Sequence, residues 1–304
     1  MGGSRRKGAV MAADGTPITF HTHGDSGGPV VVLTNGIGTT ENFWRFLIEE
    51  LEQDYTIVHW DYRGHGSTPT AVSGDYSLRT QADDLARVTR QVMGPKGGAP
   101  VHIAFSMGVA VLLELYRTQP ESVKAMALLA GAPDAPGTGT WLFKVPGSLA
   151  AARALAALAT PLVPVFAPAV RTFLRSRLPF PIARFTGVLQ PHADRSDIDQ
   201  FLAGVAAMDP VAYWRTLRGL LAARGSDVLA KVSVPVLIVA AAQDLLMPIV
   251  QVENMRRGLP HASYVLIEEA GHAGLVEKGP EMARAVRQLL LKVFPSPLRG
   301  RGSG

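Results

Sequence analysis

Over most of its length the chain alternates short apolar runs with segments of helical periodicity, and this alternation limits the folds that it can adopt. Between residues 29 and 131, apolar runs at 29–36, 55–61, 101–105 and 123–131 are separated by three helix-like segments. Strands that are apolar throughout are buried on both faces, which in a β–α–β alternation means a parallel sheet with helices on each side. The sequence therefore predicts an α/β protein with a mostly parallel, doubly wound sheet.

The same alternation returns near the C-terminus but is lost in the middle of the chain. Apolar runs at 234–244 and 262–272 are each followed by a helical segment. Residues 134–230 are instead rich in Ala, Leu, Pro, Phe and Arg, which is typical of several short helices. We expect this segment to be a helical cap inserted into one core, which comprises residues 1–133 and 231–304.

Charge and composition exclude several classes of function. The formal net charge is +5, but Arg5, Arg6, Lys7, Arg299 and Arg301 supply this excess, and the rest of the chain is balanced. We therefore expect solvated ends, and we exclude nucleic-acid binding as the main function. The chain has no cysteine, which excludes disulfides, thiolate zinc sites and cysteine nucleophiles. No apolar segment follows the basic start, so we expect a cytoplasmic protein.

A turn pair near the start of the chain predicts a hairpin. Asp14–Gly15 precedes a strand-like run that contains His21 and His23, and this run would form the second half of the hairpin. The two histidines would lie on the same face of the strand. Two histidines at this spacing can ligate a metal, but the sequence shows no third ligand, so no metal and no other cofactor is expected.

One serine interrupts the most apolar part of the chain. Ser106 separates the strand-like run VHIAF from a helix-like run, with Ala104 two residues before it and Gly108 two residues after it. A sharp strand-to-helix turn needs small residues at these two positions and leaves the serine hydroxyl exposed at the sheet edge. A helix cap is the ordinary alternative for such a serine. The pattern A-F-S-M-G indicates a nucleophile and differs in its first residue from the common G-x-S-x-G.

Candidates for a base and its orienting acid follow the two later strands. Asp244 ends the run at 234–244, and His272 lies in a glycine-flanked loop after the last apolar run. Because parallel strands place their sites at the same edge of a sheet, Ser106, Asp244 and His272 are expected to meet there. His272 would accept the serine proton, and Asp244 would fix the imidazole tautomer. Taken singly, Asp244 has a turn or cap role as its alternative, and His272 a simple loop position.

Two backbone N–H groups are expected to stabilise the oxyanion formed in such a reaction. Met107, which directly follows the serine, supplies the first. The second is assigned to Ile37, in the loop TNGIGTT after the first parallel strand, where glycines allow the backbone to turn its amide inward.

Together these motifs resemble the α/β-hydrolase fold superfamily, in particular its serine esterases and lipases with a helical cap. The resemblance is carried by NGIGTTENFW, DYRGHGST, AFSMGVAV, AAQDLLMP and EEAGH, which span nearly the whole chain outside the predicted cap. It implies the fold, the triad just described and a reaction without a cofactor. Relatives often have His-Gly where this chain has Asn35–Gly36, and Gly where it has Ala104. A serine nucleophile separates the chain from haloalkane dehalogenases and epoxide hydrolases, which attack through a carboxylate.

The resemblance also bears on two other groups of residues. It implies that the loop DYRGHGST, residues 61–68, is mainly structural. Asp134 follows the strand after the serine-bearing helix, where some members of the superfamily carry the acid, and it is kept as a reserve candidate.

The predicted cap is both basic and apolar. Six basic side chains and no acidic one lie between residues 141 and 190, and residues 154–170 are uncharged. Pro161, Pro164 and Pro168 in this short stretch argue against a transmembrane helix. Two interpretations stay open: the cap lines an apolar acyl pocket, or its surface contacts lipid or an anionic amphiphile. Both favour a small hydrophobic ester-like substrate.

We therefore expect a serine hydrolase that cleaves carboxylic esters through an acyl-enzyme. Lactonase, thioesterase, C–C bond hydrolase and perhydrolase or haloperoxidase activities would use the same three residues. A non-catalytic ligand-binding protein and a membrane-surface module remain alternatives of another class, because a fold does not fix a function. The sequence does not indicate an oligomeric state.

Overall fold

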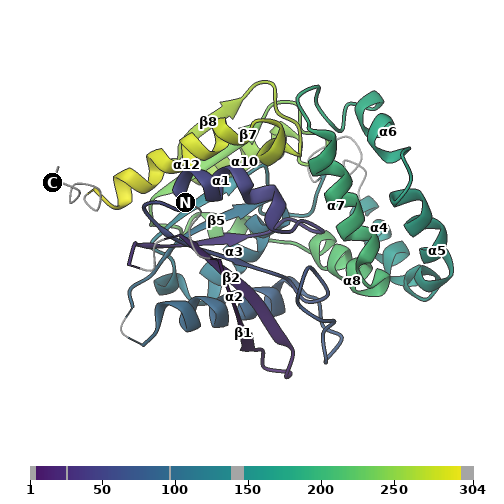
Figure 1. Ribbon diagram of the computed structural model, residues 1–304, viewed down its shortest axis with the longest axis horizontal. Helices are drawn as coiled ribbons and strands as arrows, with labels where there is room; N and C mark the ends of the chain where they lie inside the picture. Colours follow the sequence, from purple (N-terminus) through teal and green to yellow (C-terminus); the bar gives the residue numbers. More distant parts are fainter. Residues whose placement is uncertain (1–4, 25–26, 96, 138–146, 296–304) are drawn as a thin grey trace.

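The computed structural model describes residues 5–24, 27–95, 97–137 and 147–295 (Figure 1). Eight strands form one sheet in the order β1-β2-β4-β3-β5-β6-β7-β8. The strands are β1 (Arg6–Met11), β2 (Pro17–Gly24), β3 (Val30–Thr34), β4 (Thr56–Trp60), β5 (Val101–Phe105), β6 (Ala125–Leu129), β7 (Val236–Ala241) and β8 (Ser263–Ile267). β2 pairs antiparallel with β1 and β4, and all other pairs are parallel. This confirms the predicted α/β fold with a mostly parallel sheet.

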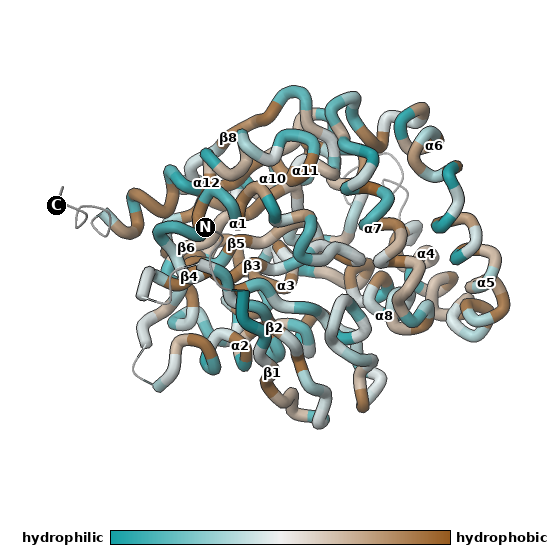
Figure 2. The backbone as a smooth tube through the Cα atoms, viewed as in Figure 1, coloured by the Kyte–Doolittle hydropathy of each residue, from teal (hydrophilic) through white to brown (hydrophobic). Residues whose placement is uncertain are grey.

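Helices connect the strands and cover both faces of the sheet. Those of the core are η1 (Glu41–Trp44), α1 (Arg45–Leu51), α2 (Leu78–Met93), α3 (Met107–Thr118), η2 (Pro120–Ser122), α10 (Ile249–Gly258), α11 (Gly274–Glu277) and α12 (Gly279–Val293). In β3, Val31 and Leu33 pack against the apolar sides of α1 and α12, while Val32 joins those of α2 and α3 on the other face. The central strands β5 and β6 are buried along their whole length and, apart from His102, hydrophobic (Figure 2), because they have no solvent-facing side.

The described residues between β6 and β7 form helices and no strand of the sheet. These are α4 (Ser148–Leu158), η4 (Thr160–Leu162), α5 (Val163–Leu174), α6 (Pro179–Phe185), α7 (Arg195–Ala207), α8 (Pro210–Leu221) and α9 (Ser226–Leu229). Helices α4 to α8 lie to one side of the sheet, at the right of Figure 1. Asp134 ties the start of this segment to its end, because its Oδ1 accepts hydrogen bonds from the amides of Gly225 (3.0 Å) and Ser226 (3.2 Å). The domain boundaries at 134 and 230 stay a prediction.

No single helix among the described residues is long and apolar enough to cross a bilayer. Helix α4 and the stretch formed by η4 and α5 meet that criterion only as a pair, bent by 41° at their junction.

The basic residues at the N-terminal end are exposed, as expected, but they are part of the fold. Arg6 and Lys7 begin β1, the first half of the predicted hairpin, and Arg5 donates hydrogen bonds to Glu41 from Nε (3.2 Å) and Nη2 (3.0 Å). The sequence RKGAVM was missed because β1 is a largely exposed edge strand, which has no need for an apolar pattern. Arg299 and Arg301 lie outside the described residues.

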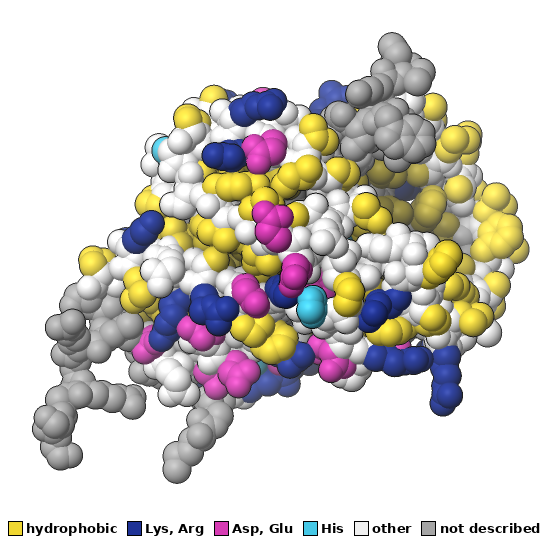
Figure 3. All heavy atoms as spheres, turned by 90° about the horizontal axis from the view of Figure 1, so that it is seen from above, with side chains coloured by type: hydrophobic (Ala, Val, Ile, Leu, Met, Phe, Trp, Pro, Cys, Tyr) yellow, Lys and Arg dark blue, Asp and Glu magenta, His cyan; other side chains and the backbone are white. Residues whose placement is uncertain are grey.

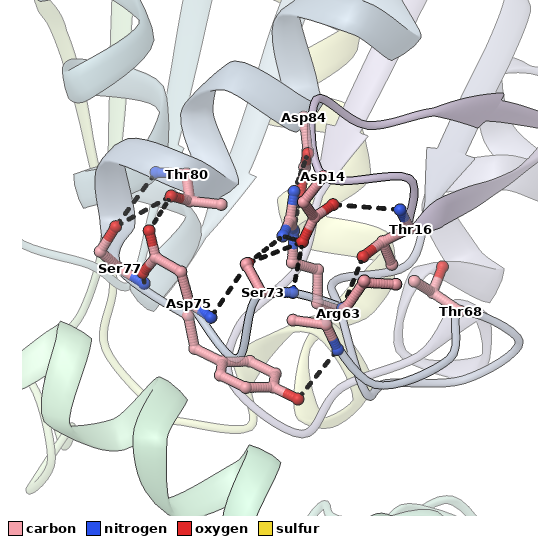
Figure 4. A network of polar contacts seen from close by, with 12 residues as sticks. Asp14, Thr16, Arg63, Thr68, Ser73, Asp75, Ser77, Thr80 and Asp84 are labelled. Carbon is pink, nitrogen blue, oxygen red and sulfur yellow. Dashed lines mark hydrogen bonds and ion pairs between the residues drawn. The ribbon is translucent and has the colours of Figure 1, made fainter.

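A buried ion network ties the hairpin to the core (Figure 4). Arg63, in the loop after β4, donates from Nε and Nη2 to the carboxylate of Asp84 on α2, at 2.6 and 2.9 Å. Its Nη1 donates to Asp14 Oδ2 at 2.6 Å, and the same oxygen accepts from the amide of Ser73 at 3.0 Å. Burial opposes ionisation of Asp14, but the hydrogen bonds from Ser73 hold its pKa well below the usual range. The arrangement fits the structural role that the resemblance implies for this loop.

Candidate active site

Ser106 stands between the end of β5 and the first residue of α3, as the sequence predicts. Its backbone has a positive φ, with φ 54° and ψ −119°, an uncommon conformation for a residue with a side chain. The amide of Val109 donates to the carbonyl of Ser106 at 3.0 Å, so the helix begins directly after the serine. Such a strained backbone persists only where the surrounding structure fixes it, and it occurs often at functional sites.

Two glycines let the chain pack tightly around this turn. A Cβ on Gly108 would lie 2.5 Å from the carbonyl oxygen of Thr34, and a Cβ on Gly36 would lie 3.1 Å from Ser106 Cβ. The loop after β3 is therefore pressed against the serine, and Ile37, the next residue of this loop, lies in the wall of the cavity in front of Ser106. Met107 is the first residue of α3, where the backbone N–H has no partner within the helix. The two predicted donors thus flank Ser106, and their role stays a proposal.

His272 and Asp244 meet Ser106 at the carboxyl edge of the sheet. Ser106 Oγ and His272 Nε2 are 2.9 Å apart, and His272 Nδ1 lies 2.8 Å from Asp244 Oδ2. The other oxygen of Asp244 accepts from the amides of Leu246 (2.9 Å) and Met247 (2.8 Å), which fixes the carboxylate. The Asp244 side chain is buried, whereas that of His272 is 17% exposed and can reach solvent or substrate. An Nδ1–H donated to Asp244 leaves the Nε2 lone pair directed at the serine hydroxyl.

Asp134, the reserve acid, is not brought to His272. Its Oδ1 accepts from the amides of Gly225 and Ser226, and its Oδ2 accepts from the Ser226 hydroxyl. Asp134 therefore connects the two ends of the helical segment. A carboxylate that the sequence analysis missed is Glu277 on α11, which accepts from the amides of Gly271 (2.7 Å) and Gln190 (2.8 Å).

Glu277 braces the loop that carries His272 and links it to the helical segment. Burial raises its pKa, against the lowering by its two backbone hydrogen bonds. In the sequence, the only indication that Glu277 belongs to the site is its position five residues after His272. Its burial could not be predicted, because it depends on how α11 turns the chain back toward the His272 loop. The more visible Glu269 is instead largely exposed and pairs with Lys278 at 2.6 Å.

An apolar cavity of about 260 Å³ opens in front of Ser106 and His272. Its walls come from the loop after β3, the serine turn, the His272 loop and the helices α6, α7 and α8. Besides Ser106 and His272, the polar side chains that it exposes are those of Thr39 and Tyr213. The apolar lining includes Phe43, Phe105, Ala183, Leu189, Ile198, Phe201 and Leu202. The cavity can hold a hydrophobic group next to the serine oxygen.

The chain is similar to known hydrolases over nearly its whole length. The family model of the alpha/beta hydrolase fold matches residues 29–279. A protein of Enterobacter cloacae named "Putative carbamate hydrolase RutD" is 27% identical over 247 residues, which are 81% of this chain and 85% of that protein. The crystal structure of a hydrolase from Pseudomonas aeruginosa has a TM-score of 0.75 at 19% identity, over 94% of this chain and 98% of that chain. An esterase from Thermogutta terrifontis has a TM-score of 0.71 at 21% identity, over 95% and 99%.

Proposed function

The chain belongs to the alpha/beta hydrolase fold family and is a hydrolase of that fold, and on this premise we propose that it cleaves carboxylic esters with a hydrophobic acyl group through a serine nucleophile. The observation that carries the proposal is the continuous path from Ser106 Oγ through His272 to Asp244, at the wall of an apolar cavity. A serine, a histidine and a buried carboxylate in this order form the arrangement that activates a hydroxyl for attack.

The reaction proceeds in two halves. Ser106 Oγ attacks the carbonyl carbon while His272 Nε2 takes its proton, and the oxyanion accepts hydrogen bonds from the amides of Ile37 and Met107. His272 returns the proton to the departing alcohol, which leaves an acyl group on Ser106. Water then attacks this ester while His272 Nε2 removes its proton. The second oxyanion collapses, the bond between the acyl carbon and Ser106 Oγ breaks, and His272 returns the proton to Oγ as the acid is released. Asp244 stabilises the imidazolium in both halves.

Rates on a series of p-nitrophenyl esters, from acetate to palmitate, test the substrate class. The apolar cavity predicts that kcat/KM rises with chain length until the acyl group fills the space beside Phe201 and Leu202. Assays on lactones, on thioesters and on C–C bonds next to carbonyl groups test the lactonase, thioesterase and C–C hydrolase alternatives. Replacing water by hydrogen peroxide as the acceptor tests the perhydrolase alternative. Carbamates belong in the series because of the name of the Enterobacter relative. A wild-type protein that turns over none of these substrates would favour a non-catalytic ligand-binding role.

Ala183→Phe is expected to shift the chain-length optimum toward short esters. Ala183 on α6 lines the cavity, and a phenyl ring there would occupy space otherwise available to the acyl chain. Each methylene that the narrowed cavity excludes costs about 1–3 kcal/mol of transition-state binding, so the palmitate-to-acetate ratio of kcat/KM should fall at least about tenfold. Ala13→Phe, at an exposed position between β1 and β2, is the matched control. An unchanged ratio in Ala183→Phe would place the acyl chain elsewhere.

We further propose that the outer face of the helical segment contacts anionic lipid surfaces. Its exposed apolar side chains are Leu155, Leu158, Leu162, Val165, Phe166, Val170, Phe173, Leu178, Ile182 and Phe185. Figure 3 shows hydrophobic side chains gathered over this part of the molecule, at the right of the view. Arg175, Arg177 and Arg184 lie among them with exposed side chains, and no acidic residue occurs between 147 and 190. Lys144, another of the basic residues noted in the sequence, lies outside the described residues.

This charge pattern predicts binding to vesicles that contain phosphatidylglycerol and much weaker binding to neutral phosphatidylcholine vesicles. Each basic group near an anionic surface contributes about 1 kcal/mol, and the apolar side chains add insertion into the interface. Phe166→Ser with Val170→Ser should lower co-sedimentation several-fold, while Arg175→Glu with Arg177→Glu should remove the preference for anionic lipid. Equal sedimentation of these variants and wild type would contradict the proposal. Self-association of wild type in analytical ultracentrifugation, abolished in the apolar variant, would assign the face to a second copy of the chain instead.

A further inference from the structure

A cluster of histidines and one glutamate lies outside the active site, at the antiparallel end of the sheet. His21 and His23 are two residues apart on β2 and therefore share a face, and His59 on β4 is the direct cross-strand partner of His21. The rings of His21 and His59 stack with centroids 6.3 Å apart. Glu41, the first residue of η1, reaches the same place from the loop after β3. The sequence analysis found no third ligand for His21 and His23. In the structure, the register of β2 on β4 brings His59 beside them, and η1 brings Glu41.

The donor atoms of this cluster converge. One donor atom from each of His21, His59 and Glu41 lies within 4.8 Å of the other two. Glu41 Oε2 is 3.7 Å from His21 Nδ1 and 3.4 Å from His23 Nε2. These separations are somewhat longer than those around a bound ion, so small side-chain movements would be needed to close a coordination sphere.

The histidines are buried with unused nitrogens. His21, His23 and His59 are 4%, 7% and 1% exposed. Within the part of the chain that the structure describes, His21 Nδ1, His23 Nε2 and His59 Nδ1 have no hydrogen-bond partner. Buried polar atoms are ordinarily hydrogen-bonded, and two of these nitrogens face Glu41 Oε2 only at 3.7 and 3.4 Å, so a ligand that enters the cluster could satisfy all three.

A further hydrogen bond orients His59. Its Nε2 lies 2.9 Å from Asn35 Nδ2 and 3.2 Å from Asn35 Oδ1, so Asn35 can pair with either tautomer. The shorter contact, to Nδ2, favours hydrogen on Nδ1 in the metal-free protein, so binding of an ion at Nδ1 requires the other tautomer, in which Nε2–H donates to Oδ1. The Asn35 side chain is held in turn by the indole N–H of Trp44 at 2.6 Å and by the carbonyl of Trp60 at 3.0 Å. Support of this kind for the second nitrogen of a histidine is usual at metal sites.

We propose that His21, His59 and Glu41 bind a divalent transition metal ion, with His23 available as a fourth ligand, and that Zn²⁺ is the best match. Neutral imidazoles with one carboxylate form a common ligand set for zinc. A solvent-open cavity of about 640 Å³ is lined by all four residues, which gives the ion a route in and room for water. This cavity shares no described lining residue with the cavity at Ser106.

Arg5 competes with the ion for Glu41. Its guanidinium donates to Glu41 Oε2, but its side chain is 55% exposed and can swing into solvent. Arg5→Ala should therefore tighten metal binding. The bound ion would join β2, β4 and η1, and through His59 it would contact Asn35, the residue before Gly36 in the loop pressed against Ser106.

The test is titration of the full-length, tag-free chain with Co²⁺, followed by visible absorption, and with Zn²⁺, followed by calorimetry. Wild type should bind one ion with the absorption of tetrahedral Co²⁺, and Zn²⁺ should raise the melting temperature. Glu41→Gln, at a position whose side chain is 29% exposed, removes a proposed ligand and should weaken affinity by at least the about 10–100-fold that loss of an outer-shell partner costs. His261→Gln, an exposed histidine, is the matched control and should bind as wild type does. Absence of the tetrahedral spectrum, or equal affinity in wild type and Glu41→Gln, would overturn the proposal, whatever the esterase measurements show.

Discussion

Ser106→Ala is expected to lower kcat for ester hydrolysis at least about a thousandfold, because it removes the nucleophile and with it the whole covalent route. The alanine would have neither the oxygen that attacks the carbonyl carbon nor the group that pairs with His272 Nε2 at 2.9 Å. The residual rate would come from the remaining hydrogen-bond donors and from substrate binding.

The same substitution should leave the fold intact, which makes its effect on rate interpretable. The turn requires positive φ, and because serine and alanine both carry a Cβ, the exchange adds no backbone strain there. Water can replace the missing hydroxyl at the partly exposed His272. The melting temperature should therefore stay close to that of wild type while the rate collapses.

Steady-state kinetics and labelling with a fluorophosphonate test this prediction together. Wild type should be labelled at Ser106 and inactivated, and Ser106→Ala should resist labelling. Ser263→Ala, at an exposed position on β8, is the control and should keep full activity. A Ser106→Ala protein with activity within about tenfold of wild type would show that another group carries the reaction.

The sequence predicts site residues well where they directly follow a continuously apolar strand. The positions of Ser106, Asp244 and His272 could be predicted because the carboxyl ends of parallel strands converge, and apolar runs mark those ends without knowledge of the tertiary structure. The serine turn is also local: five consecutive residues specify it, and the structure reproduces the strand, the turn and the helix at the expected places.

The features that were missed depend on contacts between distant residues. The exposed edge strand β1 carries basic residues and has no apolar signature. The partnership of His21 with His59 follows from the register of β2 on β4, and Glu41 joins them only because η1 packs nearby. Glu277 reaches Gln190 across 87 residues of sequence. Sequence periodicity does not indicate such pairings. The sequence therefore showed two candidate histidine ligands without a third.

Arg63→Met is expected to destabilise the protein by about 3–5 kcal/mol, the largest effect on folding that we predict for a single residue. The guanidinium is 2% exposed and Asp84 is 1% exposed, so its removal leaves a carboxylate buried without its counter-charge (Figure 4). Burial already raises the pKa of Asp84, against the lowering by Arg63. Without Arg63 this carboxylate would have to take up a proton or draw in water.

Urea unfolding of a matched set of variants separates the cost of the unpaired charge from the cost of removing the arginine. Arg63→Met with Asp84→Asn should recover part of the stability, because the fully buried carboxylate of Asp84 is then gone and only the more exposed Asp14 loses its ion pair. Arg79→Ala, at a 60% exposed arginine whose nearest contact with Asp83 is 3.7 Å, should change the free energy of unfolding by less than about 0.5 kcal/mol. If Arg63→Met is as mild as Arg79→Ala, the network does not hold the hairpin to the core. If the double variant is no more stable than the single one, the cost lies in packing and in the missing hydrogen bond to Asp14, and not in the stranded charge of Asp84.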